Sequence, residues 1–452
     1  MKIIIAGGGK VGLTLAQKLA AEGHSLTLID RDQQVLRTAV EQLDAIGVSG
    51  NCASREVLLR GGVKDADLLI ATASADEVNL LCCMTAHGIN SNLHTIARIR
   101  TPEYTQQVMT MRETFPLSLT VNPEHRAATE IERLLRYPGF LRRDTFAKGR
   151  AEIVELRIDA QSKLRNVELR QMSEVVKCRV LVCAVLRAGS AVAPSGNFVL
   201  QEGDRIFVTA PTSDLELMLK NLGVITRKVR KVLLCGGGRV SYYLADMLEG
   251  SKIGVKILEK DPKRCRELAE VLPKTQVICG DCSDHALLEE QGIDDYDALV
   301  SLTGMDESNM IMSLYASSSG VPQVITKISR SENGAIADHI ALGSTICPRE
   351  LCCNIIVRYV RAMQNQTGAA VSVHSIADGQ AEAVEFLVDE TTRNCGIPLK
   401  QMKLKPNVLL VNITRGTDTQ IPGGDSSFQP GDTIVVVTSS QGALQQINDI
   451  FA

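Results

Sequence analysis

The sequence predicts an α/β protein with two Rossmann-like doubly wound parallel-sheet domains, each followed by a small α+β domain. The first observation behind this is an internal repeat, because residues 2–12 read KIIIAGGGKVG and residues 231–241 read KVLLCGGGRVS. Each of these segments is an apolar run that leads into a glycine loop and then a helical pattern. The second observation is the alternation of apolar runs with helical periodicity that follows each loop, which requires parallel strands with right-handed crossovers.

Five apolar runs mark the strands expected in the first unit, at residues 2–6, 26–29, 45–48, 68–73 and 93–97. The stretches between them place apolar residues at helical spacing, for example at Leu13, Ala16, Leu19 and Ala20. The order is βαβαβ, and helices are expected to cover both faces of the sheet. Ligands of such sheets bind at the carboxyl ends of the strands.

The repeat continues beyond the glycine loops at an offset of 230 residues. Gly50-Asn51-Cys52 corresponds to Gly280-Asp281-Cys282, and Asp76-Glu77-x-Asn79 corresponds to Asp306-Glu307-x-Asn309. We expect Asp76 and Asp306 to cap the helices that they begin. The whole chain is therefore divided into four expected domains, at residues 1–140, 141–226, 227–370 and 371–452.

The small units are richer in β-branched residues and turn residues, and in the first of them strands are expected at 153–158, 180–185 and 205–208. Each small unit is expected to end in a short helix. Two further helical stretches, at 123–136 and 348–363, open with a proline at the first turn and link the large units to the small ones. Their apolar faces fit equally well against their own domain or against a partner subunit, so both interpretations stay open.

Composition excludes several functional classes. The 452 residues carry a net charge of −3, aromatic residues make up 3%, and tryptophan is absent, so neither a basic field nor stacking platforms favour nucleic-acid binding. The 13 cysteines resemble buried small hydrophobes in a reducing compartment. The sequence has no signal segment and no apolar run of membrane-spanning length, which predicts a cytoplasmic protein.

The first glycine loop predicts a nucleotide-binding site. Gly7-x-Gly9-x-x-Gly12 follows a strand and opens a helix, and Asp30 ends the second strand. Gly7 permits the tight turn, Gly9 allows the backbone to approach a pyrophosphate, and Gly12 allows close packing of helix on strand. A carboxylate at Asp30 accepts hydrogen bonds from the ribose hydroxyls and repels a 2′-phosphate. The pattern favours NAD(H), ATP or ADP over NADP(H).

The second copy keeps the glycines at 236 and 238 but has Ser241 at the third position and Glu259 in place of the aspartate, so its pocket is either occupied or altered. The residues expected to contact a nucleotide in the first copy are Gly7, Gly8, Gly9, Lys10, Val11, Gly12, Asp30, Asn51, Cys52, Thr72, Ala73, Ser74 and Arg98. Those expected in the second are Gly236, Gly238, Arg239, Val240, Glu259, Asp281, Cys282, Leu302, Thr303 and Lys327.

An NAD-dependent oxidoreductase is the main alternative, because dehydrogenases share this glycine pattern. The seven histidines are dispersed, however, and no acid–base constellation emerges from the sequence. Cys279-Gly280-Asp281-Cys282 has the spacing of a redox pair, but the first copy keeps only Cys52 at that turn, which favours ordinary buried thiols. No enzymatic activity is therefore expected.

Over essentially its whole length the sequence resembles the TrkA family, the regulatory subunits of Trk potassium-uptake systems with tandem regulator-of-potassium-conductance units. The residues that carry the resemblance are the GGGKVG loop, Asp30, the Gly50-Asn51 turn, the segment from Thr72 to Asn79, Ala97-Arg98, Pro102-Glu103-Tyr104 and Asn122-Pro123-Glu124.

This resemblance implies a cytoplasmic homo-oligomeric ring, typically a tetramer, under a membrane-embedded potassium channel or transporter that itself carries the ion. NAD(H), ATP or ADP would shift the gate. The resemblance also implies that Glu124 helps to hold a divalent cation near the nucleotide phosphates, whereas the second copy has Arg349 at that position. Some relatives bind cyclic di-AMP between their small domains, and the sequence leaves that question open.

Overall fold

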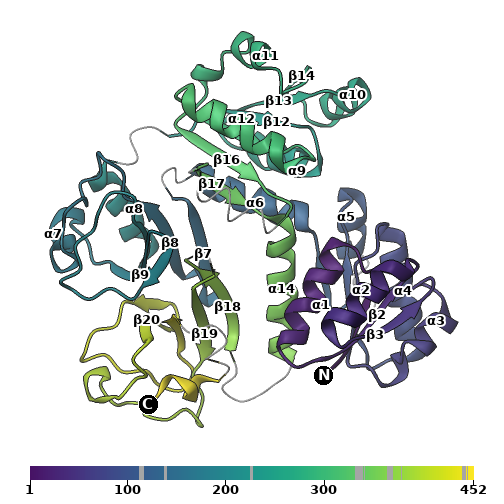
Figure 1. Cartoon of the computed structure of the whole chain (residues 1–452), viewed down its shortest axis with the longest axis horizontal. Helices are drawn as coiled ribbons and strands as arrows, with labels where there is room; N and C mark the ends of the chain where they lie inside the picture. The colour runs from purple at the N-terminus through teal and green to yellow at the C-terminus, as the bar shows by residue number, and fades with distance from the viewer. Residues whose placement is uncertain are drawn as a thin grey trace. The chain divides into compact units, whose positions relative to one another are not determined.

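The computed structural model (Figure 1) describes residues 1–110, 117–136, 140–223, 228–330, 340, 342–363, 370–377, 379–439, 444 and 446–452. By its internal contacts the chain forms two compact units. One comprises Met1–Thr129 together with Cys347–Val360, and the other comprises Glu130–Ile346 together with Arg361–Ala452. The boundary expected at residues 226 and 227 lies outside the described residues.

The first unit is built on a six-stranded parallel sheet with the order β3-β2-β1-β4-β5-β6. The sheet confirms the doubly wound prediction, and the order reverses between β1 and β4. Its strands are β1 (Lys2–Ala6), β2 (Ser25–Asp30), β3 (Ile46–Ser49), β4 (Leu68–Ala71), β5 (His94–Arg98) and β6 (Leu119–Val121). Its helices are α1 (Lys10–Ala21), α2 (Gln33–Leu43), α3 (Arg55–Arg60), η1 (Val63–Asp65), α4 (Asp76–Ile89) and α5 (Pro102–Thr110).

The second unit contains the copied sheet, in the equivalent order β14-β13-β12-β15-β16-β17. Its strands are β12 (Lys231–Cys235), β13 (Gly254–Glu259), β14 (Gln276–Cys279), β15 (Ala298–Ser301), β16 (Gln323–Lys327) and β17 (Ser344–Ile346). Its helices are α9 (Arg239–Glu249), α10 (Pro262–Val271), α11 (His285–Glu290), η4 (Ile293–Asp295) and α12 (Asp306–Ser318). The sixth strands β6 and β17 were not predicted, because three residues are too few to show a period.

The small domains are five-stranded antiparallel sheets, ordered β10-β9-β11-β8-β7 and β18-β19-β22-β20-β21. The first comprises β7 (Arg142–Phe146), η2 (Ala147–Gly149), β8 (Ala151–Arg157), η3 (Leu169–Gln171), α7 (Met172–Val176), β9 (Leu181–Arg187), β10 (Ser190–Val192), β11 (Arg205–Ala210) and α8 (Thr212–Leu222). The second comprises β18 (Ala370–Ile376), β19 (Ala381–Leu387), η5 (Leu399–Gln401), β20 (Val408–Arg415), β21 (Asp418–Gln420), β22 (Thr433–Thr438) and η6 (Ile447–Ile450). The expected terminal α-helix is confirmed in the first domain. In the second, the described residues near the C-terminus form the short 3-10 helix η6, and residues 440–443 and 445 lie outside the described part of the chain.

The two linking helices form as predicted, α6 at Pro123–Arg136 and α14 at Pro348–Met363. Although α14 follows the second sheet in sequence, its first thirteen residues lie in the unit of the first sheet. Lys18 of α1 donates to Asn354 (3.1 Å) and pairs with Glu350 (2.9 Å). Among the described residues, no helix has both the length and the apolar content that a bilayer crossing requires.

Candidate nucleotide-binding sites

The first glycine loop has the backbone that a nucleotide site needs. Gly7 adopts φ +108°, and a Cβ there would lie 2.7 Å from the backbone nitrogen of Ala73. A Cβ on Gly12 would lie 1.9 Å from the carbonyl oxygen of Gly7, so helix α1 approaches strand β1 as closely as a glycine permits. The helix begins at Lys10 with Gly9 as its exposed N-cap, and no side chain caps its first turn. The first-turn N–H groups and the helix dipole are therefore available to an anion.

Asp30 holds this loop in place from the end of β2. Its Oδ2 accepts a hydrogen bond from the Gly8 N–H (2.6 Å), and its Oδ1 accepts one from the Asp32 N–H (2.9 Å). The carboxylate thus lies at the carboxyl end of β2 beside the glycine loop. That is the position from which an acidic side chain reaches the ribose hydroxyls of a dinucleotide.

The turn after β3 contributes Asn51 and Cys52. The Gly50 N–H donates to the Asp30 carbonyl oxygen (2.9 Å), and Asn51 Oδ1 accepts from the Ala53 N–H (3.2 Å). In the second copy Asp281 accepts from the Ser283 N–H (2.9 Å), so asparagine and aspartate make the same local turn. The Cys52 side chain is buried, and its contact with the thiol of Cys82 lowers its pKa. The side chain of Asn51 and not that of Cys52 faces solvent at this edge.

The turn after β4 is fixed by Thr72 and by Asn79, a residue that the sequence interpretation did not assign to the site. The Thr72 hydroxyl donates to the Gly7 carbonyl oxygen (2.9 Å). The fully buried Asn79 amide accepts from the Ala73 N–H (2.7 Å) and donates to the carbonyl oxygens of Ala73 (3.1 Å) and Arg98 (2.8 Å). One side chain therefore joins the ends of β4 and β5. The sequence did mark this residue, because an asparagine recurs at the same place of the repeat, as Asn79 in the first copy and Asn309 in the second.

Arg98 closes the same edge. Its guanidinium donates to the Ala73 carbonyl oxygen (2.8 Å), so it supports the loop directly. Burial and the neighbouring Arg100 lower its pKa, while the charges of Glu124 and Asp76 act in the opposite direction. Glu124 lies in the first turn of α6, and its Oε2 is buried without a hydrogen-bond partner.

Glu124 is the residue for which the resemblance implies a metal ion. In the part of the chain that the structure describes, no group of three or more histidine, cysteine, aspartate or glutamate side chains could hold one. Phosphate oxygens of a bound nucleotide are ligands of the kind that hard divalent ions prefer.

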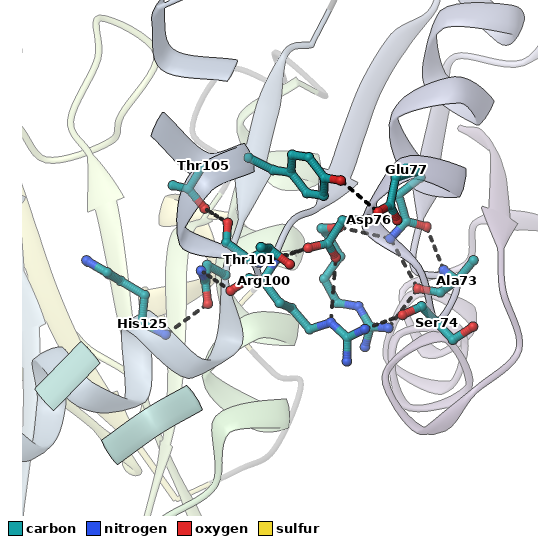
Figure 2. Close-up of polar contacts among 12 residues, drawn as sticks. Ala73, Ser74, Asp76, Glu77, Arg100, Thr101, Thr105 and His125 are labelled. Atoms are coloured by element: carbon teal, nitrogen blue, oxygen red, sulfur yellow. Dashed lines mark hydrogen bonds and ion pairs between the residues drawn. The ribbon is translucent and has the colours of Figure 1, made fainter. Parts of the chain in front are cut away.

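Asp76 does not cap its helix, so that expectation was wrong. The N-cap of α4 is Ala75, and no side chain bonds to the N-terminal turn. Figure 2 shows that the Asp76 carboxylate instead points to the loop after β5, where Oδ2 accepts from the N–H groups of Arg100 (2.9 Å) and Thr101 (2.8 Å). Arg100 also pairs with Oδ1 (3.6 Å), and its guanidinium donates to the Ser74 carbonyl oxygen. Ser74 is therefore held at the rim through its backbone.

Asp306 repeats the arrangement of Asp76 in the second copy, so the same expectation was wrong there. The N-cap of α12 is Met305. The Asp306 carboxylate accepts from the N–H groups of Ser329 (2.8 Å) and Arg330 (2.9 Å). Each carboxylate therefore ties the start of a helix to the loop that follows the neighbouring strand.

The second glycine loop has the same construction with two substitutions. Gly236 has φ +103°, and α9 begins at Arg239 after the exposed Gly238, with Val240 buried in its first turn. Ser241 is fully buried and its hydroxyl donates to the Gly236 carbonyl oxygen, so serine replaces the close glycine packing with a hydrogen bond. No side chain caps the first turn of α9, so its N–H groups are available to an anion.

Glu259 takes the place of Asp30. Its carboxylate accepts from the N–H groups of Gly237 (2.6 Å) and Asp261 (2.9 Å), the same pattern as in the first copy. Arg264 adds a contact that was not predicted, because its Nε donates to the Gly237 carbonyl oxygen (2.9 Å). A cationic side chain therefore lies against the second loop.

The remaining predicted residues of the second site also converge at this edge. Lys327 Nζ donates to the Leu302 carbonyl oxygen (3.1 Å), and Thr303 donates its N–H to Asn309 Oδ1 (2.9 Å). Cys282 is buried, and its contact with the thiol of Cys235 lowers its pKa. The thiol neighbour of Cys282 is thus Cys235, and Cys282 is buried as interpreted. Cys279 is exposed, so the interpretation as a buried thiol was wrong for that residue.

These features define a class of protein, one with two Rossmann-type nucleotide-binding domains in tandem, each followed by a small antiparallel domain. The model of the TrkA-N domain matches residues 3–114 and 232–348, and the model of the TrkA-C domain matches residues 153–223 and 383–452. The chain therefore belongs to the TrkA family, as the sequence motifs had indicated.

Full-length relatives agree with this assignment. The chain is 32% identical to the Trk system potassium uptake protein TrkA of Halomonas elongata and 30% identical to that of Haemophilus influenzae. Each alignment covers 100% of this chain and 98% of the relative. The TrkA homolog of Archaeoglobus fulgidus is 30% identical, with both chains covered completely.

Solved structures of the same fold include the RCK domain of GsuK, with a TM-score of 0.62, 17% identity, and coverage of 97% of this chain and 92% of that one. The GsuK channel gives a TM-score of 0.61 at 17% identity and covers 97% of this chain and 77% of that one. At this level of identity the likeness shows the fold, and it confirms the predicted combination of parallel and antiparallel sheets.

Proposed function

We propose that this chain is the cytoplasmic regulatory subunit of a potassium-uptake system, and that it binds NAD(H), ATP or ADP at two sites and gates a membrane-embedded potassium transporter or channel. Membership of the TrkA family supports the regulatory role, and the alternative of an oxidoreductase is not favoured. The observation that carries nucleotide binding is the carboxylate that supports each glycine loop, Asp30 in one copy and Glu259 in the other. Each lies beside an open helix N-terminus.

The nature of the ligand follows from these carboxylates. A negative charge at the end of the second strand accepts bonds from two ribose hydroxyls and repels a 2′-phosphate, so NADP(H) should bind more weakly than NAD(H). Two solved structures of similar fold support this class of ligand, since one is described as the GsuK channel bound to NAD and another as GsuK bound to ADP. The same fold recurs in the human SLO3 gating ring, which supports an oligomeric assembly, and we propose a homotetramer.

Gating by a nucleotide requires that the ligand bind two conformations of the assembly with different affinity, because equal affinity shifts nothing. The helix termini at Lys10 and Arg239 are the elements that a phosphate contacts, and both belong to helices that pack on the central strands of their sheets. A difference of tenfold in affinity between two states would move the equilibrium by about 1.4 kcal/mol.

Calorimetric titration of the purified chain tests the proposal. NAD, NADH, ATP and ADP are titrated separately into the wild type and into Asp30→Ala, Glu259→Ala and the matched surface control Glu56→Gln. Two sites are expected for the wild type, one for each single variant at a carboxylate, and two for the control. No binding of any of the four nucleotides to the wild type would contradict the proposal.

Potassium flux tests the regulatory part separately. The chain is added to vesicles that contain its membrane partner, with and without the nucleotide that binds most tightly. A nucleotide-dependent change in flux that the Asp30→Ala or Glu259→Ala variant loses is the expected result. Tight binding without any change in flux would retain the nucleotide sites and reject the gating role. Consumption of NADH with a carbonyl substrate would instead support the oxidoreductase.

A further inference from the structure

The two small domains meet through an aspartate–histidine pair. The carboxylate oxygen Oδ1 of Asp144, in β7, lies 3.0 Å from Nδ1 of His374, in β18. The ring of His374 also lies against that of Phe146, with 4.6 Å between the centroids. Around this pair the buried apolar residues of both domains form a single cluster, which includes Phe146, Ile153, Ile376 and Val435. The pair is thus part of a shared core.

Asp144 and His374 occupy equivalent positions in the repeat. In the first domain Asp144 pairs in register with Ile153, and in the second His374 pairs with Ala383. Asp144 and His374 are 230 residues apart, and so are their strand partners Ile153 and Ala383, which is the offset of the duplication. A residue that contacts its own equivalent lies on the local twofold axis that relates the two copies.

Contacts farther from the axis confirm the twofold relation. Arg150 donates to the carbonyl oxygen of Gly416, in the β20–β21 turn, and its equivalent Gln380 donates to that of Gly189, in the β9–β10 turn. The donors are equivalent residues, and the acceptors lie in equivalent turns of the two domains, so the contacts are exchanged between the copies as a symmetric pair would require. The symmetry of the backbone has therefore survived the divergence of the side chains.

The chemistry on the axis is not symmetric. Arg142 pairs with Asp144 through Nε (2.9 Å), whereas the residue equivalent to Arg142 is Ser372, whose hydroxyl donates to Glu385 (2.6 Å). Glu385 also accepts from the Ala147 N–H of the first domain (3.0 Å). Its equivalent Glu155 pairs instead with Arg205 within its own domain. Each copy therefore presents a different set of charges to the same face.

We infer that this face of the first small domain fits only the second small domain and rejects another copy of itself. Two first domains in the same arrangement would bring two Asp144 carboxylates to hydrogen-bond distance in a buried setting. Each would keep its own Arg142 but would lack the His374 imidazole between them, and like charges at that distance are unfavourable. Two second domains would place two His374 rings together with no carboxylate on the axis. The partner of the first domain is the unlike copy, and the assembly of several chains must use other surfaces.

A charge-swap experiment in the full chain tests this inference. The variants are Asp144→His, His374→Asp, the double swap Asp144→His/His374→Asp, and the control Glu216→His on the exposed side of α8. Hydrogen exchange of the Ala147 amide is the readout, because that amide is bonded to Glu385 across the interface. Coupling energies of contacting charged residues correspond to about 10- to 100-fold in rate, so each single swap should accelerate exchange by that factor.

The double swap decides the question. It restores unlike partners on the axis. The exchange rate of the Ala147 amide should therefore return to within about threefold of the wild type, which is less than the acceleration expected of either single swap. If both single variants exchange like the wild type, or if the double swap is no slower than the faster single variant, the inference is wrong. Asp144→Asn removes the charge while keeping the shape, and it should lie between the wild type and Asp144→His, which separates charge from packing.

Sedimentation equilibrium of the same variants tests the rejection of like partners. If Asp144→Asn forms larger assemblies than the wild type and its Ala147 amide loses protection, the charge on the axis is what bars like pairing. Assemblies of unchanged size would contradict that role of the charge. This result does not depend on nucleotide binding, so it can fail while the proposed function stands.

Discussion

Replacement of Asp76 by alanine should release the loop that follows β5. The Asp76 carboxylate is 4% exposed and accepts hydrogen bonds from the N–H groups of Arg100 and Thr101. A hydrogen bond to a charged group contributes about 1.5–3 kcal/mol, which gives about 3–6 kcal/mol for the two. The loop lies near solvent, so water can reach the two freed N–H groups. We therefore expect a loss at the lower end of this range, about 3 kcal/mol.

Native-state hydrogen exchange at the Arg100 and Thr101 amides measures this loss locally, which is necessary because a chain with several domains does not unfold in one step. About 3 kcal/mol corresponds to an acceleration of roughly 100-fold or more. Asp306→Ala is the matched control, and it should accelerate exchange at Ser329 and Arg330 without affecting Arg100. An Asp76→Ala protein whose Arg100 and Thr101 amides exchange at the wild-type rate would refute the reasoning.

Four further outcomes are expected. Gly12→Val should destabilise the first Rossmann domain by about 1–3 kcal/mol in thermal unfolding and abolish nucleotide binding there, because its Cβ would meet the Gly7 carbonyl oxygen; Gly12→Ser should be milder, as Ser241 shows. Asp204→Ala and Asp432→Ala should each cost about 1.5–3 kcal/mol in local hydrogen exchange of β11 or β22, since each buried carboxylate accepts from the partly exposed guanidinium of Arg187 or Arg415, and unequal costs would show that the copies differ. Burial opposes ionisation of Asp144, but Arg142 and His374 outweigh it and lower its pKa to about 2. Its stabilisation, about 2.5 kcal/mol, should therefore be complete above pH ~4 and be lost as the pH falls towards 2, and Asp144→Asn should flatten that slope. Iodoacetamide should modify the exposed Cys279 of the native chain and leave Cys353 intact, because burial raises the pKa of Cys353 to about 12.

The sequence was sufficient for the parts of the fold that repeat or alternate. Five strands of the first sheet, the glycine loop and both linking helices were predicted because each has a period or a glycine pattern of its own. Strand β7 was missed, because the charged residues Arg142, Arg143 and Asp144 hide the apolar alternation that marks a strand. Only the structure shows that the second small domain covers Asp144. Burial of that kind depends on contacts between residues 230 positions apart, which no local pattern records.

The candidate site was predicted at its glycine loops but not at its supports. The carboxylates Asp30 and Glu259 followed from their spacing, whereas Asp76 was assigned to a helix cap because an acidic residue at a helix start commonly has that role. The structure gives Ala75 that place and turns the carboxylate to another loop. Asn79 lay in the repeated motif without a role, because its three backbone partners come from two different strand ends.

Helix α14, from the second half of the sequence, contacts helix α1 of the first nucleotide site. Cys353 of this helix donates its thiol to the carbonyl oxygen of Val11 (3.8 Å), in the first turn of α1, and Glu350 pairs with Lys18 farther along α1. A phosphate that draws the N-terminus of α1 towards itself therefore acts on α14 through these two contacts.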